Sequence, residues 1–161
     1  MLYSVCLLRE IAFRICPTTR ANDISGIGAK MVGGRFNSKG RAVLYTSSST
    51  SLSIVEVLAH YSIETSPKDL SLRTISFPAD SVKTIEATDL DPSWKDTPVS
   101  MLAKSIGDAW IDSLESLVLA VPSVLNLYEM NYLINPAHPW FKEVKIENLE
   151  EWIFDERLLK K

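Results

Sequence analysis

The sequence has little of what most catalytic and metal sites are built from. It holds two histidines and two cysteines in 161 residues, and it contains no GxSxG, HExxH, GxGxxG or Walker-type lysine motif. These absences argue against a serine-hydrolase elbow, a zinc-protease helix, a Rossmann turn and a P-loop. Cys6 and Cys16 have neither CxxC nor metal-ligand spacing, so we expect both to be reduced, buried thiols.

Basic runs and long apolar runs are also missing. The net charge is −3 and the lysines and arginines are scattered, which disfavours nucleic acid and acidic membrane surfaces as partners. No apolar stretch reaches the roughly 18 residues of a membrane span. Arg9 and Glu10 interrupt the N-terminal apolar run, and no basic segment precedes it, unlike a secretory signal. We therefore expect a soluble, cytoplasmic protein.

The apolar pattern predicts one α+β domain over residues 1–161, built around a mixed, largely antiparallel sheet. Six to eight strands and two or three helices are expected. The strands cover 3–15, 42–47, 70–77, 82–85 and 117–121, with two more in 144–154, and the main helices end near 61 and cover 100–114. Segments 18–34 and 86–98 are rich in turn residues or prolines, and we expect both to be loops. The carboxylates of 86–98 do not match a calcium-loop pattern.

One segment, residues 33–61, combines a glycine turn, an apolar strand, a hydroxyl-rich loop and a helix. Arg35 follows two glycines, where the backbone can come close to a ligand. Glu56 lies in a helix with apolar residues on two sides, so we expect the helix to be mostly buried and the carboxylate to be paired, hydrogen-bonded or functional. With Tyr45 on the strand between them, these side chains predict a pocket for an anionic ligand.

Other interpretations of these residues stay open on the sequence alone. Glu56 can be salt-bridged to Arg35 in the core of a non-catalytic binding module. Glu56 and His60 form an ExxxH pair, but no third metal ligand can be named. Arg14 is either a solvated strand arginine or a ligand for a carboxylate or phosphate. Ser123 follows a predicted strand end, where functional side chains and plain turn serines are equally common.

Taken together, the motifs resemble the RES-domain family, which is named for an arginine, a glutamate and a serine. The resemblance is carried, in chain order, by FRI at 13–15, GGRFNSKG at 33–40, VLYTS at 43–47, SIVEVLAH at 53–60, VPS at 121–123, NYLINPAHP at 131–139 and FDERL at 154–158. It extends over nearly the whole chain, and the combination is more specific than any fragment. Phe36 stands where the family usually has tryptophan, and no clear aromatic for base stacking follows Ile15.

The resemblance implies a fold similar to ADP-ribosyltransferases and a toxin of a bacterial toxin–antitoxin pair that degrades NAD at the nicotinamide–ribose bond. Carried over onto this chain, the motifs give Glu56, Arg35 and Ser123 as catalytic residues and Arg14, Arg35, Tyr45, Ser47 and Asn131 as substrate-binding residues. NAD is then the substrate, without a cofactor or metal. The implied partner is a cognate Xre-like helix-turn-helix antitoxin, and a homodimer within the complex is left open. The acceptor of ADP-ribose stays open between water, phosphate as co-substrate, and a protein side chain.

The chemistry of NAD agrees with this set of residues. Guanidinium groups match diphosphate oxygens with bidentate, charge-assisted hydrogen bonds, so Arg14 and Arg35 would clamp the substrate. The leaving nicotinamide already carries the positive charge, so its departure needs no strong general acid. Glu56 would then oppose the developing cation, Tyr45 would pack against a ring, and Ser123 would fix a ribose or amide group.

Overall fold

Seven strands join into one sheet in the order β4-β5-β6-β2-β1-β3-β7. The structure is a computed structural model, and it describes residues 8–61, 65 and 68–159. Among the described strands β4 and β5 run parallel, and the other neighbouring pairs are antiparallel. The sheet is therefore mixed and largely antiparallel, which confirms the predicted α+β class.

The elements follow one another along the chain with short connections. The strands are β1 (Arg9–Pro17), β2 (Leu44–Ser47), β3 (Leu70–Pro78), β4 (Val82–Thr84), β5 (Val118–Pro122), β6 (Met130–Ile134) and β7 (Lys145–Trp152). The helices are α1 (Ile27–Val32), α2 (Thr50–Leu58), α3 (Met101–Ser113) and α4 (Glu156–Leu159). Single 3₁₀ turns are η1 (Thr18–Arg20), η2 (Ala79–Ser81), η3 (Ala87–Asp89), η4 (Pro92–Lys95) and η5 (Pro139–Glu143).

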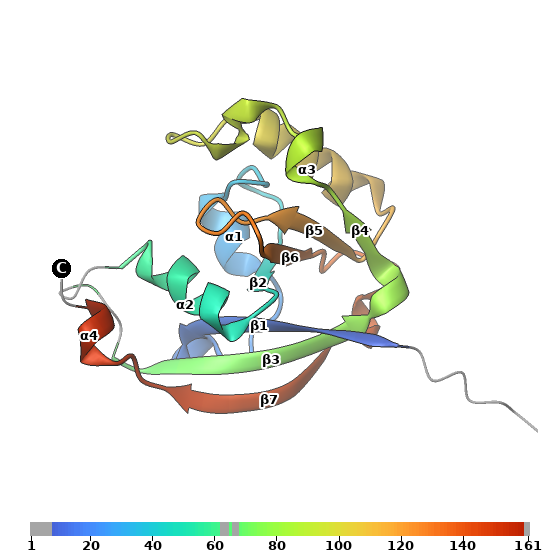
Figure 1. Ribbon diagram of the computed structural model, residues 1–161. Coiled ribbons are helices and arrows are strands. Elements are labelled where there is room, and N and C mark those ends of the chain that lie inside the picture. The colour runs from blue at the N-terminus through green and yellow to red at the C-terminus, as the bar shows by residue number, and fades with distance from the viewer. Residues whose placement is uncertain (1–7, 62–64, 66–67, 160–161) are drawn as a thin grey trace, which may run out of the picture.

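The sheet divides between β1 and β2. β1 pairs with β3 along all nine of its residues, but it pairs with β2 at the single position Phe13–Ser47. In Figure 1, β1, β3 and β7 form a curved layer at the bottom, and β4, β5 and β6 rise from it toward α3 at the top. Beyond Phe13 the end of β1 therefore lacks β2 as a neighbour, and Arg14 to Pro17 border a cavity instead.

The largest apolar cluster packs α3 and the glycine turn against one face of β2, β5 and β6. Its buried members are Phe36, Val43, Leu90, Trp94, Ala103, Trp110, Ile111, Leu119, Val121 and Leu133. Gly107 of α3 makes this packing possible, because a Cβ there would lie 1.8 Å from the carbonyl oxygen of Phe36. The helix is thus in direct backbone contact with the turn that carries Arg35.

α2 begins where the hydroxyl-rich sequence predicts a cap. Ser49 is the N-cap residue, and its Oγ accepts a hydrogen bond from Leu52 N at 3.0 Å. Ser53 Oγ donates to the carbonyl of Phe13 at 3.0 Å, which fixes the helix on β1. The expectation of a mostly buried helix is wrong: Val55 is 43% exposed, because α2 packs on the sheet with one side.

The segment 18–34, expected as a loop, contains regular structure. It forms η1 and then α1, a helix of six residues that is too short to show a helical period in the sequence. α1 starts after Gly26, whose φ of 70° favours glycine. Gly40 N donates to Lys30 O at 2.8 Å and so holds the end of the helix from a later turn. That tertiary contact leaves no periodic signal.

The C-terminal segment also differs from the expectation. It forms one strand, β7, instead of two, because a bulge opposite Thr74 and Ile75 lets the ladder with β3 continue. The segment 86–98 is not a fully solvated loop, since Leu90 and Trp94 are buried in the largest cluster. The short helices α1 and α4 bring the described helices to four instead of two or three.

The remaining expected elements are found close to their predicted positions. The strands expected at 42–47, 70–77, 82–85 and 117–121 correspond to β2, β3, β4 and β5, and the helix at 100–114 corresponds to α3. The first half of the opening strand and Cys6 lie outside the described residues. Cys16 is a buried free thiol, as expected.

Candidate functional site

A cavity of about 950 Å³ lies where β1 and β2 diverge, bounded by the 20–29 segment, the glycine turn and α2. Its volume falls within the roughly 300–1,000 Å³ that is typical of small-molecule sites. Six of the predicted site residues line it: Arg14, Arg35, Tyr45, Ser47, Glu56 and Asn131. The seventh, Ser123, is fully buried beside Glu56.

Glu56 is held by two neutral donors. Its Oε1 accepts hydrogen bonds from Ser123 Oγ at 2.9 Å and from Asn131 Nδ2 at 2.5 Å, and no described residue donates to Oε2. The Arg35 salt bridge of the binding-module interpretation is not among the ion pairs of the described residues. The carboxylate is therefore oriented without being neutralised, and one oxygen stays available to a ligand.

The two donors to Glu56 are themselves fixed. Ser123 Oγ accepts from the backbone N–H groups two and three residues later, at 3.1 and 3.3 Å. Ser47 Oγ donates to Asn131 Oδ1 at 3.0 Å, which leaves the amide nitrogen of Asn131 to face Glu56. The structure thus brings together four predicted residues from β2, α2, β6 and the connection after β5.

A second carboxylate, Glu129, ties the same connection to the start of α2. It accepts a hydrogen bond from Ser49 Oγ, the α2 cap, and another from Asn126 Nδ2 at 2.6 Å. The sequence analysis did not single out Glu129. Its position next to the Asn131 motif was the only signal, and that signal does not distinguish it from a surface glutamate.

Tyr45 supports the glycine turn. Its hydroxyl donates to Asn37 Oδ1 at 2.8 Å and accepts from Phe36 N at 3.1 Å. Burial raises the pKa of Tyr45 above its ordinary value, so the hydroxyl stays protonated and continues to donate. A Cβ on Gly34 would lie 2.6 Å from this hydroxyl, which explains the glycine. The polar end of Tyr45 is therefore used inside the protein, while its ring lines the cavity.

Arg35 connects the glycine turn to the segment after η4. Its Nη1 donates to Trp94 O at 2.6 Å and to Asp96 O at 3.1 Å. Its Nε and Nη2 meet no acceptor among the described residues. One nitrogen is thus anchored and two remain available to an anion in the cavity.

Arg14 lies in β1 directly across from Arg73 in β3. Burial lowers the pKa of the Arg14 guanidinium from its ordinary value, yet an arginine stays charged at neutral pH. No described residue accepts a hydrogen bond from the Arg14 side chain. Arg73 is fully buried and was missed by the sequence analysis, although a single arginine inside an otherwise uncharged strand was the signal.

The charges around the cavity are mainly positive. The described lining residues include four cations, Arg14, Arg20, Arg35 and Lys104, and two carboxylates, Asp23 and Glu56. The described cavity lining therefore carries two more positive than negative charges, in a chain whose net charge is −3. A concave wall of one sign concentrates ions of the other. The fold is thus an α+β domain with a cavity of small-molecule size whose lining carries a cationic excess.

Within the described part of the chain, no three His, Cys, Asp or Glu side chains gather closely enough to hold a metal ion. No described helix has the length and apolar character needed to cross a membrane. His60 of the ExxxH pair is exposed just beyond the end of α2.

Comparison with known proteins identifies the family. The RES domain model matches residues 11–155. The chain is 35% identical over 147 residues to the Prs ADP-ribosylating toxin of Sphingobium sp., covering 89% of this chain and 91% of that protein. It is 36% identical over 138 residues to Toxin Res of Pseudomonas putida, covering 84% and 92%. The chain therefore belongs to the RES-domain family, and its relatives place it among the Res toxins.

A solved structure has the same fold. The match is to the crystal structure of the M. tuberculosis MbcT–MbcA toxin–antitoxin complex, with a TM-score of 0.73 over 90% of this chain and 85% of that chain. The sequence identity is 17%, so the likeness concerns the fold. The predicted family and the predicted α+β architecture are both confirmed.

The hydrogen bonds of Tyr45 lead to a stability prediction. Tyr45→Phe leaves Phe36 N and the buried Asn37 Oδ1 without this partner, so we expect the free energy of unfolding to fall by about 1–3 kcal/mol. Urea unfolding measures the change. Tyr132→Phe is the matched control, because no described residue bonds to that hydroxyl, and we expect a change below about 0.5 kcal/mol. Equal losses in the two variants would show that the turn does not depend on Tyr45.

Proposed function

We propose that this chain is the toxin of a bacterial toxin–antitoxin pair, that residues 1–161 form a single RES domain, and that it cleaves NAD at the nicotinamide–ribose bond. The observation that carries the proposal is the state of Glu56, a carboxylate oriented by neutral donors in a cavity with a cationic excess. Such a site suits a substrate with a diphosphate at one part and a carbon that becomes cationic at another. The name of the Sphingobium relative supports ADP-ribose chemistry.

In this proposal the arginines bind and orient the substrate. The diphosphate of NAD lies against Arg14 and the two unanchored nitrogens of Arg35, because guanidinium groups offer parallel donors to phosphate oxygens. Tyr45 acts through the turn, since its hydroxyl accepts from the backbone N–H of Phe36 and donates to the side chain of Asn37. The nicotinamide ribose then lies beside Glu56.

The bond breaks with its electron pair leaving on nicotinamide. The ring nitrogen becomes neutral, and the ribose carbon becomes an oxocarbenium-like centre. Glu56 Oε2 accepts a hydrogen bond from a ribose hydroxyl, and the negative charge of the carboxylate stabilises the positive charge that develops on the ribose carbon. Ser123 and Asn131 keep the carboxylate in place, so little reorganisation is needed during the reaction. Ser123 is fully buried and in this scheme is a positioning residue, whereas the sequence analysis expected it to touch the substrate.

Glu56→Gln is expected to lower the turnover of NAD at least about 100-fold, because the change is nearly isosteric and removes the charge that opposes the cation. Nicotinamide release by the purified protein measures the rate, and thermal unfolding checks that the variant folds. Glu150→Gln on β7 is the matched control, since this exposed glutamate does not line the cavity. A folded Glu56→Gln protein that releases nicotinamide at the parental rate would make Glu56 structural.

The acceptor of ADP-ribose is proposed to be phosphate. A cavity with a cationic excess holds a free phosphate near the reacting carbon, where attack is favoured by proximity. His138 does not line the cavity. His60 does, but it is exposed beyond the end of α2 and no hydrogen bond among the described residues joins it to Glu56, so neither is an evident base for water. Transfer to a protein side chain is the second candidate, favoured by the name of the Sphingobium relative.

A phosphate titration distinguishes these acceptors. We expect NAD consumption to rise and saturate with phosphate, and the product to be a phosphorylated ADP-ribose, because the bound phosphate competes with water for the cation. Mass spectrometry of the product and the rate at each phosphate concentration test this. A flat rate with free ADP-ribose as product would indicate hydrolysis, and consumption that requires added protein would indicate ADP-ribosyl transfer.

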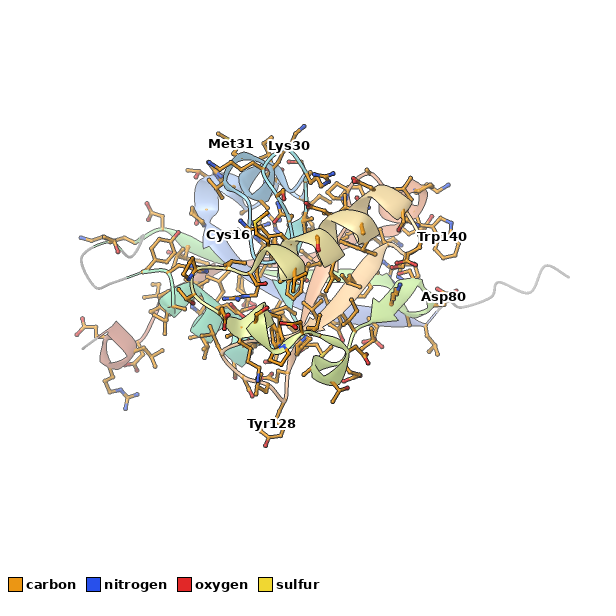
Figure 2. All side chains as sticks on the ribbon, turned by 90° about the horizontal axis from the view of Figure 1, so that it is seen from above. Cys16, Lys30, Met31, Asp80, Tyr128 and Trp140 are labelled. Carbon is orange, nitrogen blue, oxygen red and sulfur yellow. The ribbon has the colours of Figure 1, made fainter. Side chains whose placement is uncertain are left out.

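The proposed partner is an Xre-like helix-turn-helix antitoxin that covers the cavity. Ile27, Val32 and Leu125 line the cavity and are 40%, 72% and 46% exposed. Figure 2 shows Met31 on α1 and Tyr128 after β5 projecting outward on opposite sides of the view. Exposed apolar side chains around a pocket are typical of an interaction site. Within the cavity, an acidic group of the antitoxin would take the place of phosphate on Arg14 or Arg35.

Val32→Asp and Leu125→Asp are expected to weaken the complex, since each places a charge in an apolar contact. Co-purification of a tagged toxin variant with its antitoxin measures the loss. Leu149→Asp on β7, an equally polarising change at a residue 41% exposed outside the cavity, should leave the complex intact. A complex that still binds ADP-ribose while NAD consumption is suppressed would contradict occlusion of the cavity.

A further inference from the structure

Arg73 is the most unusual charged residue of the protein. Its side chain is fully buried in the middle of β3. Its Nη1 donates to Asp23 O at 2.9 Å and its Nη2 to Arg20 O at 2.7 Å, while its Nε has no partner. Both acceptors are neutral carbonyls, so these bonds do not balance the positive charge. A buried charge without an opposite charge in contact is costly.

The position of Arg73 makes this cost larger. It is the direct cross-strand partner of Arg14, and like charges at opposed positions of a sheet destabilise the pair. Burial lowers the pKa of each guanidinium, and the positive charge of Arg14 lowers the pKa of Arg73 further. A purely structural anchor for two carbonyls does not require a charge at this place. Proteins usually avoid burying like charges opposite each other, and exceptions to such rules are typically found at functional sites.

The two carbonyls that Arg73 binds belong to the cavity wall. Arg20 and Asp23 both line the cavity, and Arg73 itself does not. The Asp23 carboxylate accepts from Ser25 N at 2.8 Å, and hydrogen bonds from Ser25 hold its pKa below the ordinary value. Burial is the largest influence on the pKa of Arg14 and of Arg73 and lowers both. The negative charge of Asp23 raises the pKa of both arginines. One half-buried carboxylate therefore acts on the half-buried guanidinium of Arg14 and the fully buried one of Arg73, and a positive excess remains.

We propose that Arg73 is a positioning residue that makes the cavity selective for phosphate-bearing nucleotides: it holds the 20–23 wall against Arg14 and adds a second positive charge behind it. This inference rests on the proposed function, in which Arg14 receives the diphosphate of NAD. The phosphate then supplies the negative charge that the pair lacks in the free protein. Arg73 touches no substrate in this scheme and acts through Arg14 and the wall.

The test compares Arg73→Met with Arg73→Lys. Steady-state kinetics with NAD and with nicotinamide riboside, which lacks phosphate, separate an effect on anion binding from an effect on the fold. For Arg73→Met we expect KM for NAD to rise about tenfold with kcat changed less than about twofold, and KM for the riboside to stay within about twofold. Arg73→Lys keeps the charge and should restore KM for NAD to within about threefold.

Arg9→Met is the matched control. Like Arg73, Arg9 lies in the sheet and donates to two backbone carbonyls, those of Ser76 and Glu143 at 3.0 and 2.7 Å. It belongs to β1, however, so it is not opposite Arg14, and it does not line the cavity. It should lose stability without a change in KM for NAD. Asp23→Asn keeps the acceptor for Ser25 and removes the opposing charge, so KM for NAD should fall by about two- to fivefold. This variant also tests the inference should Arg73→Met fail to fold.

Calorimetric binding of ADP-ribose and of adenosine keeps this inference apart from the proposed reaction. Weaker binding of ADP-ribose by Arg73→Met, with binding of adenosine unchanged, supports the role of Arg73 even in a protein that does not consume NAD. Three results would overturn it: equal ADP-ribose affinity in Arg73→Met and parent, equal losses for ADP-ribose and adenosine, or an Arg73→Lys protein as impaired as Arg73→Met. An unchanged ADP-ribose affinity in Asp23→Asn would show that the charges around Arg14 do not control phosphate binding, and it would overturn the inference as well.

Discussion

The site depends on the hydrogen bonds that Ser123 and Asn131 donate to one oxygen of Glu56. They join a helix, a strand and the connection after another strand, and they orient a carboxylate without neutralising it. The register of the sheet makes this possible, because Asn131 pairs with Ser47 on β2 and with Val121 on β5. A slip of one residue would turn Asn131 to the other face and leave the carboxylate without a donor. Fold and site are therefore coupled through the register of β6.

The positive charge of the cavity is a second constraint on the site. It differs from the first because the protein itself does not balance this charge. Glu56 is held within the protein through one of its two oxygens, whereas the Arg14 and Arg73 pair leaves positive charge without an equal partner. The division of the sheet between β1 and β2 creates the space in which that charge faces a ligand. A continuous pairing of the two strands would close the cavity. The gap in the sheet and the unbalanced arginines thus belong to one arrangement.

Much of the fold was predictable from local pattern. Short apolar runs bounded by turn residues located β2, β3, β4 and β5, and the serine-rich segment offered several candidate caps for α2, of which the structure uses Ser49. The misses have physical causes. α1 has six residues and is held by a bond from Gly40, so no period could reveal it. β7 is one strand because a bulge at Glu147, opposite Thr74 and Ile75, takes up an irregularity that in the sequence looks like a break between two strands. Trp94 is buried by α3, which lies outside its own segment.

By itself the sequence determined the class of the fold, the positions of most strands along the chain, the family, and a short list of chemically notable side chains. These follow from alternation, turn chemistry and motifs, which act over a few residues. Only the tertiary structure decided what the side chains do to one another. The donors to Glu56 are 67 and 75 residues away along the chain, and Arg73 meets Arg14 because two strands pair in one register. Such contacts depend on the packing of the whole chain, and local pattern holds no record of them.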